Sequence, residues 1–147
     1  MDKINNKARI EKELQRIAES NDGVLTAQAV VEAAKSARSV LHNQFTWDDS
    51  DAAHQYRLWQ ARQLIRCTVT VEPRTHVEVR AYVSLTTDRQ NDGGGYREMT
   101  KVLSRKEDRA QMLADALDEL RVVEQKYKQL KELASVFAEV RKVRKAM

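Results

Sequence analysis

A row of apolar side chains near the carboxyl end constrains this sequence more than any other feature. The spacings along the row alternate between three and four residues, and no position in it is charged. Its members are Leu113, Ala116, Leu120, Val123, Tyr127, Leu130, Ala134 and Phe137. Such spacing over more than three heptads is typical of a coiled coil or a helix bundle. Residues 104–147 are therefore predicted to form one long C-terminal helix, or two helices separated by a tight break.

Two different surfaces could cover this row, which we call the apolar seam. A second copy of the chain would make the seam an oligomerisation site, whereas the N-terminal helices of the same chain would make it part of an internal core. Tyr127, Ala116 and Ala134 make the seam uneven, which suits both arrangements. A single helix of about 40 residues would be about 60 Å long, which is longer than a domain of this size needs. We therefore expect a homo-oligomer.

A capping-box pattern separates the seam segment from the rest of the chain. Glu107 follows Ser104 by three positions, the spacing at which each side chain can accept a hydrogen bond from the other residue's backbone N–H. Two parts are therefore expected. Residues 1–103 form a helical and antiparallel-sheet module, and residues 104–147 form the long helix, used for oligomerisation or for intramolecular packing.

The first module opens with two helical patterns. Apolar residues at helical spacing predict an amphipathic helix over about residues 3–20. They are Ile10, Leu14, Ile17 and Ala18. Thr26 is expected to cap a second helix that ends near Arg38, because a threonine hydroxyl can accept from the first-turn N–H groups. The buried stripe of that helix consists of Ala27, Val30, Val31 and Ala34.

A connecting segment and a third helix follow. The segment shows no clear period, and Leu41, Phe45 and Trp47 are expected to fill the core from it. Short polar side chains then precede the third helix and are candidates for its N-cap. They are Thr46, Asp48 and Ser50. The apolar positions of the third helix are Ala52, Ala53, Tyr56, Trp59, Ala61, Leu64 and Ile65.

The hydrophobic period then changes from 3.6 to two. Apolar and polar residues alternate on both sides of a turn at Pro73-Arg74-Thr75, which predicts a β-hairpin with one buried face. The apolar positions are Cys67, Val69, Val71, Val77, Val79, Ala81, Val83 and Leu85. Residues 88–95 are expected to form a flexible polar loop, and residues 96–103 a third antiparallel strand. The predicted fold class is therefore α+β.

The residue types do not predict an enzyme. His42, His54 and His76 fall in different predicted elements, and the single cysteine, Cys67, can form neither an intrachain disulfide nor a zinc cluster. The three glycines at 93–95 are not followed by Lys-Ser or Lys-Thr, so they predict a loop and not a phosphate loop. We expect no enzyme activity, no cofactor and no bound metal.

The predicted location is the cytoplasm. A lone cysteine is most simply explained by a reducing compartment. The first residues lack the apolar core of a signal peptide, and no apolar stretch approaches the roughly 18 residues that span a bilayer. No membrane partner is therefore expected.

The distribution of cations points to nucleic acid more than their number does. Lys and Arg total 26 against 22 Asp and Glu, and a net charge of +4 does not by itself support nucleic-acid binding. Between His54 and Arg80, however, every cation is an arginine, and the planar guanidinium can donate two hydrogen bonds to one phosphate. The predicted contacts are Arg57, Arg62, Arg66, Arg74, Arg80, Arg89, Arg97 and Lys101. The alternative is a solvated helix face with ordinary hairpin charges.

A second group of cations lies at the carboxyl end: Arg141, Lys142, Arg144 and Lys145. Cations in the last turn of a helix complement the helix dipole, which would give them a purely structural role. They would serve equally well as a phosphate-binding tail. Both interpretations stay open.

Several segments resemble small proteins of tailed bacteriophages and prophages, most of them without an assigned function. They are residues 41–49 (LHNQFTWDD), 52–57 (AAHQYR), 60–65 (QARQLI), 82–85 (YVSL), 95–97 (GYR) and 115–120 (DALDEL). The resemblance extends over most of the chain. It implies a phage origin and the cytoplasm of a bacterial host, and it brings no catalytic residues.

Two hypotheses for function follow from these patterns. The first is an oligomeric phage accessory protein that binds nucleic acid, expected to be DNA, through its basic surface with little dependence on sequence. The second is a structural or interaction component without nucleic-acid binding, whose partner is a host or phage protein that docks on the apolar seam or on exposed sheet edges.

Overall fold

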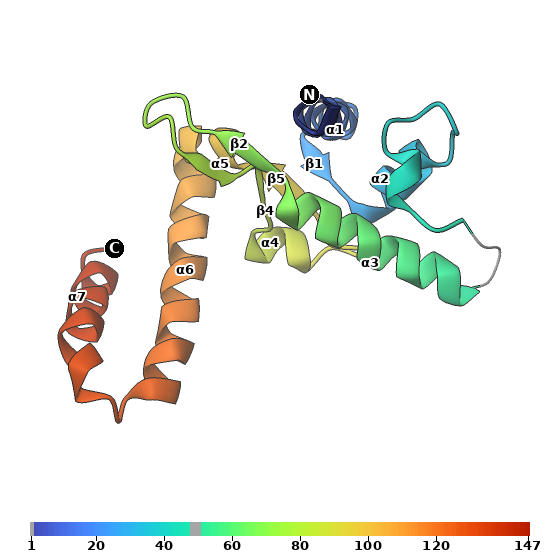
Figure 1. Ribbon diagram of the computed structural model, residues 1–147. Helices are drawn as coiled ribbons and strands as arrows, with labels where there is room; N and C mark the ends of the chain where they lie inside the picture. Colours follow the sequence, from blue (N-terminus) through green and yellow to red (C-terminus); the bar gives the residue numbers. More distant parts are fainter. Residues whose placement is uncertain (1, 48–50) are drawn as a thin grey trace.

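The protein has an α+β fold in which two C-terminal helices project from a body of helices and short strands (Figure 1). The computed structural model describes residues 2–47 and 51–147. This confirms the predicted fold class of N-terminal helices, a small antiparallel sheet and C-terminal helical structure. No helix in the described ranges is both long and apolar enough to cross a membrane.

The two N-terminal helices form where the periodicity predicts them. Helix α1 spans Asp2–Glu19 and α2 spans Ala27–Ala34. The Thr26 hydroxyl accepts a hydrogen bond from Ala29 N at 3.1 Å, so the predicted cap is confirmed. Helix α2 ends four residues before Arg38, because the Ser36 and Ser39 hydroxyls accept backbone N–H groups downstream and so compete with helical hydrogen bonds. The predicted stripe of α2 lies in the core, as does that of α1 except for Ile10, which is partly buried against it.

A two-residue strand, β1 (Val24–Leu25), lies between these helices and was not predicted. It pairs antiparallel with β5 (Tyr96–Glu98), which pairs on its other side with β4 (Tyr82–Val83). Gly95 allows the close approach of β1 and β5, since a Cβ at this position would lie 2.6 Å from Val24 Cγ1. A strand of two residues is too short to show a period of two in the sequence.

The segment before the third helix fills the core only in part. It contains a short 3₁₀ helix, η1 (His42–Gln44). Leu41 and Phe45 are buried as predicted, whereas the prediction for Trp47 is wrong because its ring lies at the surface. The candidate caps Asp48 and Ser50 lie outside the described residues.

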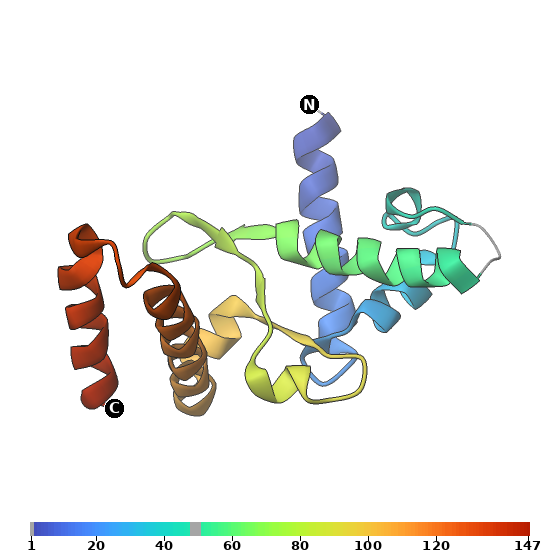
Figure 2. The same ribbon diagram turned by 90° about the horizontal axis from the view of Figure 1, so that it is seen from below.

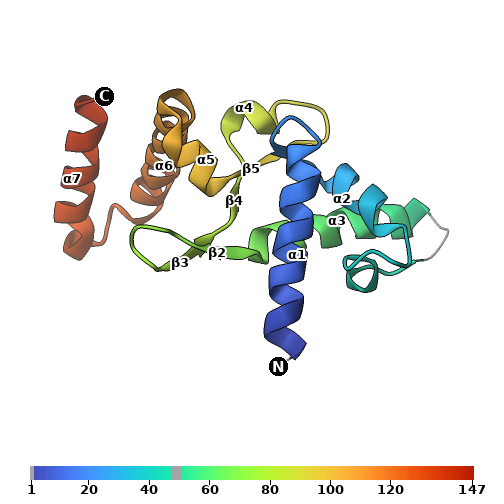
Figure 3. The same ribbon diagram turned by 90° about the horizontal axis from the view of Figure 1, so that it is seen from above.

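Helix α3 (Asp51–Cys67) runs across α1 on one side of the body (Figure 3). Only Ala61 and Ile65 of its predicted apolar positions are fully buried. Tyr56 and Trp59 are 49% and 51% exposed, so these two apolar positions lie outside the core. The helix contacts the core along a narrow stripe, and seven apolar positions cover more of its circumference than that stripe includes.

The predicted β-hairpin forms, but its apolar face is open. Strand β2 (Val69–Val71) pairs antiparallel with β3 (Glu78–Arg80). Val71 and Val77, toward the tip, are more than half exposed, whereas Val69 and Val79 are half-buried.

The second predicted strand divides at Ala81. Ala81 N donates to Thr68 O at the base of the hairpin, and Ala81 O accepts from Met99 N beside β5, so this residue links the two sheets. Ala81 and Tyr82 are both buried, although alternation predicts an exposed Tyr82. The chain changes sheets here, and the change interrupts the period of two.

The segment from residue 86 to residue 104 contains more helix than predicted. A short helix, α4 (Thr86–Arg89), occupies part of the expected polar loop, and the carboxylate of Asp88 is buried. The predicted strand over residues 96–103 is limited to β5, and α5 (Met99–Ser104) follows immediately with Val102 in the core.

The C-terminal segment is a helical hairpin and not one long helix. Helix α6 spans Lys106–Tyr127, a 3₁₀ turn, η2, spans Lys131–Leu133, and α7 spans Ala134–Lys145. Helix α7 returns antiparallel beside α6 (Figures 1 and 2). Of the two predicted alternatives, two helices with a tight break is therefore the observed one.

The predicted capping box does not form at the start of α6. Arg105 is the N-cap residue and makes no side-chain capping bond. The Ser104 hydroxyl instead donates to Lys101 O at 2.8 Å, which ends α5. The prediction fails because a separate short helix, α5, already includes Ser104.

Candidate nucleic-acid interface

Four of the predicted arginines line one hollow on the body. Arg62 and Arg66 come from the last turns of α3, Arg80 from the end of β3 and Arg89 from α4. The hollow has a volume of about 730 Å³, and we call it the arginine basin. It lies where the end of α3, β4 and α4 face the inner side of α6 (Figure 1).

The basin floor includes a stretch of backbone with little side-chain cover. Gly93 and Gly94 adopt φ values of +81° and +67°, which other residues rarely adopt. Only two carboxylates, those of Asp92 and Glu119, line the basin with the four guanidinium groups. The phenol of Tyr82 at its edge stays protonated, because burial, followed by the nearby Glu98 carboxylate, raises its pKa.

Three of the four basin arginines have no anionic partner in the described part of the chain. Within residues 2–47 and 51–147, no carboxylate lies within ion-pair distance of Arg62, Arg66 or Arg80. Arg89 is more constrained, since it donates to Ser84 O at 2.5 Å and lies 3.5 Å from Asp115. The basin therefore presents guanidinium donors that an external anion can occupy.

Arg57 lies on a different face of α3 from the basin. It precedes Arg62 by five residues, which places the two side chains about 140° apart around the helix. Its guanidinium lies over the Trp47 ring at 5.4 Å and donates to Thr46 O. The predicted arginine stripe along α3 is thus divided, and Arg57 supports the loop before the helix.

Arg97 joins the body to the C-terminal hairpin. It lies 2.8 Å from the buried Asp88 and 3.2 Å from Asp108 of α6, and hydrogen bonding to Asp88 raises its pKa. Lys101 is similarly paired with Glu98 at 3.2 Å. Sequence reasoning grouped both cations with the basic surface, because Asp88 in an apparent polar loop gave no sign that it would be buried.

Arg74 stands at the tip of the β2–β3 hairpin, at the opposite end from Arg80. The Glu72 carboxylate accepts from Thr75 N at 2.6 Å and from Arg74 N at 3.1 Å. Hydrogen bonding to Thr75 lowers the pKa of Glu72, so this carboxylate stays charged and holds the turn. Arg74 is exposed but does not line the basin.

Two of the four C-terminal cations connect the two helices of the hairpin. Arg141 pairs with Glu124 across the two helices, and Arg144 donates to Leu117 O at 2.5 Å and to Asp118 at 3.3 Å. Lys142 pairs with Glu139 on its own helix at 2.6 Å. These contacts fit the structural interpretation of the cluster.

The apolar seam remains largely uncovered. Phe137 is buried, but Leu113, Leu120, Val123 and Tyr127 are each about 40% exposed. The exposed positions also include Ala116, Leu130 and Ala134. Helix α7 packs against the neighbouring face of α6, around Leu117, which is not a seam residue. In the part of the chain that the structure describes, α6 and α7 lie away from α1 and α2 (Figure 1), so these N-terminal helices do not cover the seam.

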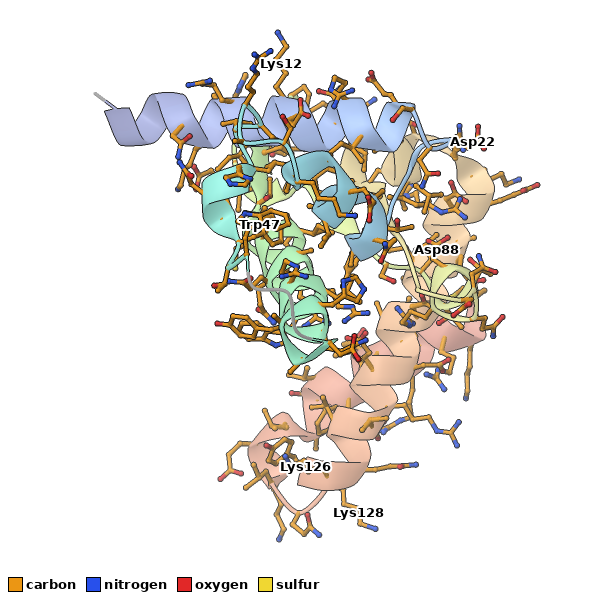
Figure 4. All side chains as sticks on the ribbon, turned by 90° about the vertical axis from the view of Figure 1, so that its right-hand side faces the viewer. Lys12, Asp22, Trp47, Asp88, Lys126 and Lys128 are labelled. Carbon is orange, nitrogen blue, oxygen red and sulfur yellow. The ribbon has the colours of Figure 1, made fainter. Side chains whose placement is uncertain are left out.

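Sequence reasoning missed a second charged hollow, of about 670 Å³, between α1 and the segment after α2. Its cations are Arg9, Lys12, Arg16 and Arg38. Arg16 is neutralised by Glu13 at 2.6 Å, and Glu19 also lines the hollow. Lys12 lies far from the hairpin tip with Lys126 and Lys128 (Figure 4), so this hollow is separate from the C-terminal surfaces.

No cluster of three or more His, Cys, Asp or Glu side chains suited to a metal is found among the described residues. Comparisons with protein-family models, with curated proteins and with solved structures each gave no significant match.

Proposed function

We propose that this chain is an oligomeric accessory protein that binds nucleic acid through the arginine basin, largely independently of sequence. One observation carries the proposal: Arg62, Arg66 and Arg80 converge on one hollow without an anionic partner in the described part of the chain. Arg97, Lys101 and Arg141 have carboxylate partners. The basin is thus a place where several arginines together leave positive charge for an external ligand.

The composition of the basin favours contact with the phosphate backbone. A guanidinium fork donates two hydrogen bonds to one phosphate, and glycine backbone permits close approach of a strand. Asn91 is the one amide side chain among its lining residues, so few groups are placed to read base edges. Binding through phosphates carries little sequence information.

Self-association would strengthen a site of this size. Three or four phosphate contacts make a weak site, and repeating it in an oligomer raises the effective affinity. The exposed apolar seam supports this part of the proposal, because a continuous apolar surface is typical of an interface. A phage origin and a bacterial cytoplasm rest on the sequence resemblance.

The proposal is tested by titrating labelled 20-mer DNA, single-stranded and duplex, at 50 and 200 mM salt. Three phosphate contacts should weaken duplex binding on the order of 40-fold between these concentrations. Replacing Arg62, Arg66 and Arg80 by Glu should abolish binding. The matched control replaces Arg9, Lys12 and Arg38, all exposed and outside the basin, by Glu.

Two results would contradict the basin as the site. One is the absence of binding to any DNA or RNA at 50 mM salt. The other is an equal loss of binding in the control variant, which would show that binding depends on the net charge of the protein and not on the basin.

A second candidate function is a structural component whose partner is a host or phage protein. The observation in its favour is the exposed apolar surface of the hairpin, to which Val122, Val136 and Val143 contribute as well as the seam. A chain that is monomeric at high concentration and lacks affinity for nucleic acid at low salt would favour this function.

A further inference from the structure

Two aromatic rings on α3 are stacked on each other and open to solvent. The rings of Tyr56 and Trp59 lie 5.6 Å apart with an interplanar angle of 15°. Each residue is about half exposed. Neither side chain contributes its full apolar area to the core, so packing in the core does not explain why two aromatic residues occupy these positions.

This pair lies in line with the arginine basin. Trp59, Arg62 and Arg66 are spaced by three and then four residues, which places them on one face of α3. Trp59 and Arg66 are about 10 Å apart along the helix axis. The exposed aromatic surface therefore continues along α3 into the row of guanidinium groups.

We infer that Tyr56 and Trp59 form a base-stacking site and that the ligand of the basin is a single-stranded nucleic acid. The inference rests on the proposed function. In a duplex the base faces are covered by neighbouring bases, whereas an unpaired strand can place a base against an aromatic ring and its phosphates against arginines. Aromatic rings beside a cationic groove are the usual composition of single-strand binding sites.

The other tryptophan provides an internal contrast. Trp47 stacks on His42, donates from Nε1 to His42 O at 3.0 Å, and carries Arg57 over its ring. Its ring is therefore engaged within the protein. Trp59 differs in having an accessible ring beside arginines without carboxylate partners among the described residues.

The test uses the full chain with Trp47→Phe, so that Trp59 is the single tryptophan. Labelled dT15, U15 and a 15-base-pair duplex are titrated at low salt while Trp59 emission is recorded. Either single strand should bind more tightly than the duplex and quench the emission. Trp59→Ala and Tyr56→Ala should each weaken single-strand binding about tenfold and leave duplex binding unchanged.

Trp59→Phe is the conservative control and should retain most of the affinity, because it keeps a stacking face. Circular dichroism melts of each variant exclude unfolding as the cause of any loss. Equal affinity for duplex and single strand, with Trp59→Ala unchanged, would overturn the stacking inference and leave the basin proposal intact. Absence of binding to all three ligands would overturn both.

A second, independent observation concerns how two copies would meet. The exposed valines of α7, Val136 and Val143, lie about 100–120° around that helix from Phe137, which faces α6. The seam residues of α6 lie about 40–120° around their helix from Leu117, which faces α7, in the same rotational sense. Because the two helices run antiparallel, both sets share one side of the hairpin.

Charges along the seam favour one orientation of a second copy. Glu119 and Lys126, both exposed, immediately precede the seam residues Leu120 and Tyr127 on its uncovered edge. In an antiparallel pair of α6 helices, Leu120 of each copy would face Val123 of the other. Glu119 of each copy would then lie opposite Lys126 of the other, which gives two contacts between opposite charges.

A parallel pair would bring like charges together. It would place Glu119 of each copy against Glu124 of the other. The geometry thus points to a symmetric antiparallel dimer that buries this apolar side of both hairpins. The second copy's Lys126 would then lie at the rim of the arginine basin, where Glu119 is one of its two carboxylates.

Sedimentation equilibrium of the full chain over a range of concentrations tests this dimer. Glu119→Lys and Lys126→Glu should each weaken dimerisation by at least about tenfold, because each introduces two like-charge contacts. The double exchange should restore it. Glu107→Lys, which makes the same charge change on α6 away from the seam, should have little effect.

If the Glu119→Lys variant associates more strongly than the wild-type chain, the two helices pair in parallel and the antiparallel inference is overturned. A wild-type chain that stays monomeric at high concentration would overturn dimerisation altogether.

Discussion

The body, residues 2–105, and the C-terminal hairpin carry similar apolar periodicity, but only the body covers it. Leu14, Val30 and Ile65 in the body are fully buried, whereas Leu120 and Val123 in the hairpin are about 40% exposed. Helix α7 uses one face of α6 and leaves the seam face open. The comparison shows that periodicity identifies the apolar face of a helix and does not reveal whether the same chain covers that face.

Charged groups also differ between the two regions, but here the hairpin is the region whose groups are paired. In the hairpin, Arg141 and Arg144 are paired across the two helices. In the body, Arg62, Arg66 and Arg80 meet in a hollow with no carboxylate partner in the described ranges. The hairpin therefore leaves an apolar face open, and the body leaves three arginines in one hollow without carboxylate partners among the described residues.

The largest expected effect compares a leucine from each region. Leu14→Ala should lower the free energy of unfolding by about 2–5 kcal/mol, because it leaves a cavity in the core. Leu120→Ala, at a concentration where the chain is monomeric, should lower it by less than about 1 kcal/mol. Urea denaturation measures both. Equal losses would show that the seam is already covered within one chain.

The next effect concerns the junction between the two regions. Arg97→Ala removes the cation beside Asp88, whose side chain is 2% exposed. A buried carboxylate without its partner should lower the free energy of unfolding by about 3 kcal/mol. Arg105→Ala is the matched control, since Arg105 is largely exposed and lies 3.8 Å from Asp108. Its loss should stay below about 1 kcal/mol by chemical denaturation.

A smaller effect depends on pH. Burial acts to raise the pKa of Asp115, but hydrogen bonds from Thr86 and Gln111 outweigh it, and the pKa lies below the ordinary 3.8. A lowered pKa stabilises the fold above pH 3.8, and the stabilisation is lost as pH falls through the folded-state pKa. Asp115→Asn should therefore cost about 1 kcal/mol near neutrality.

Thermal unfolding of wild type and Asp115→Asn between pH 7 and pH 3 measures this difference. The two curves should converge as the solution is acidified. A difference that is constant over the whole range would mean that the Asp115 carboxylate does not hold α4 against α6.

The smallest effect compares two helix starts. Thr26→Ala should destabilise the body by about 1 kcal/mol, because it removes the cap of α2. Ser104→Ala, before the hairpin, should change stability by no more than about 0.5 kcal/mol, because Ser104 does not cap α6. Thermal melts give both values. A larger loss for Ser104→Ala would indicate that the predicted capping box forms in solution.

Part of the candidate site could be read from the sequence. Arginine enrichment between His54 and Arg80 includes three of the arginines that line the basin, and two of them, Arg62 and Arg66, share a face of α3. Arg57 and Arg97 could not be separated from them in advance. The separation depends on Trp47 and Asp88, which contact these arginines only after the chain has folded.

Local interactions determined the elements that the sequence alone predicts: α1, α2 with its Thr26 cap, and the β2–β3 hairpin with its turn. Helix periodicity, capping and turn chemistry act over a few residues, so they are legible in the sequence. Tertiary packing decided the burial of Tyr82, the change of sheets at Ala81 and the break that makes the hairpin. It also decided which apolar faces and which arginines stayed open, because covering a face or neutralising a charge requires segments distant in sequence.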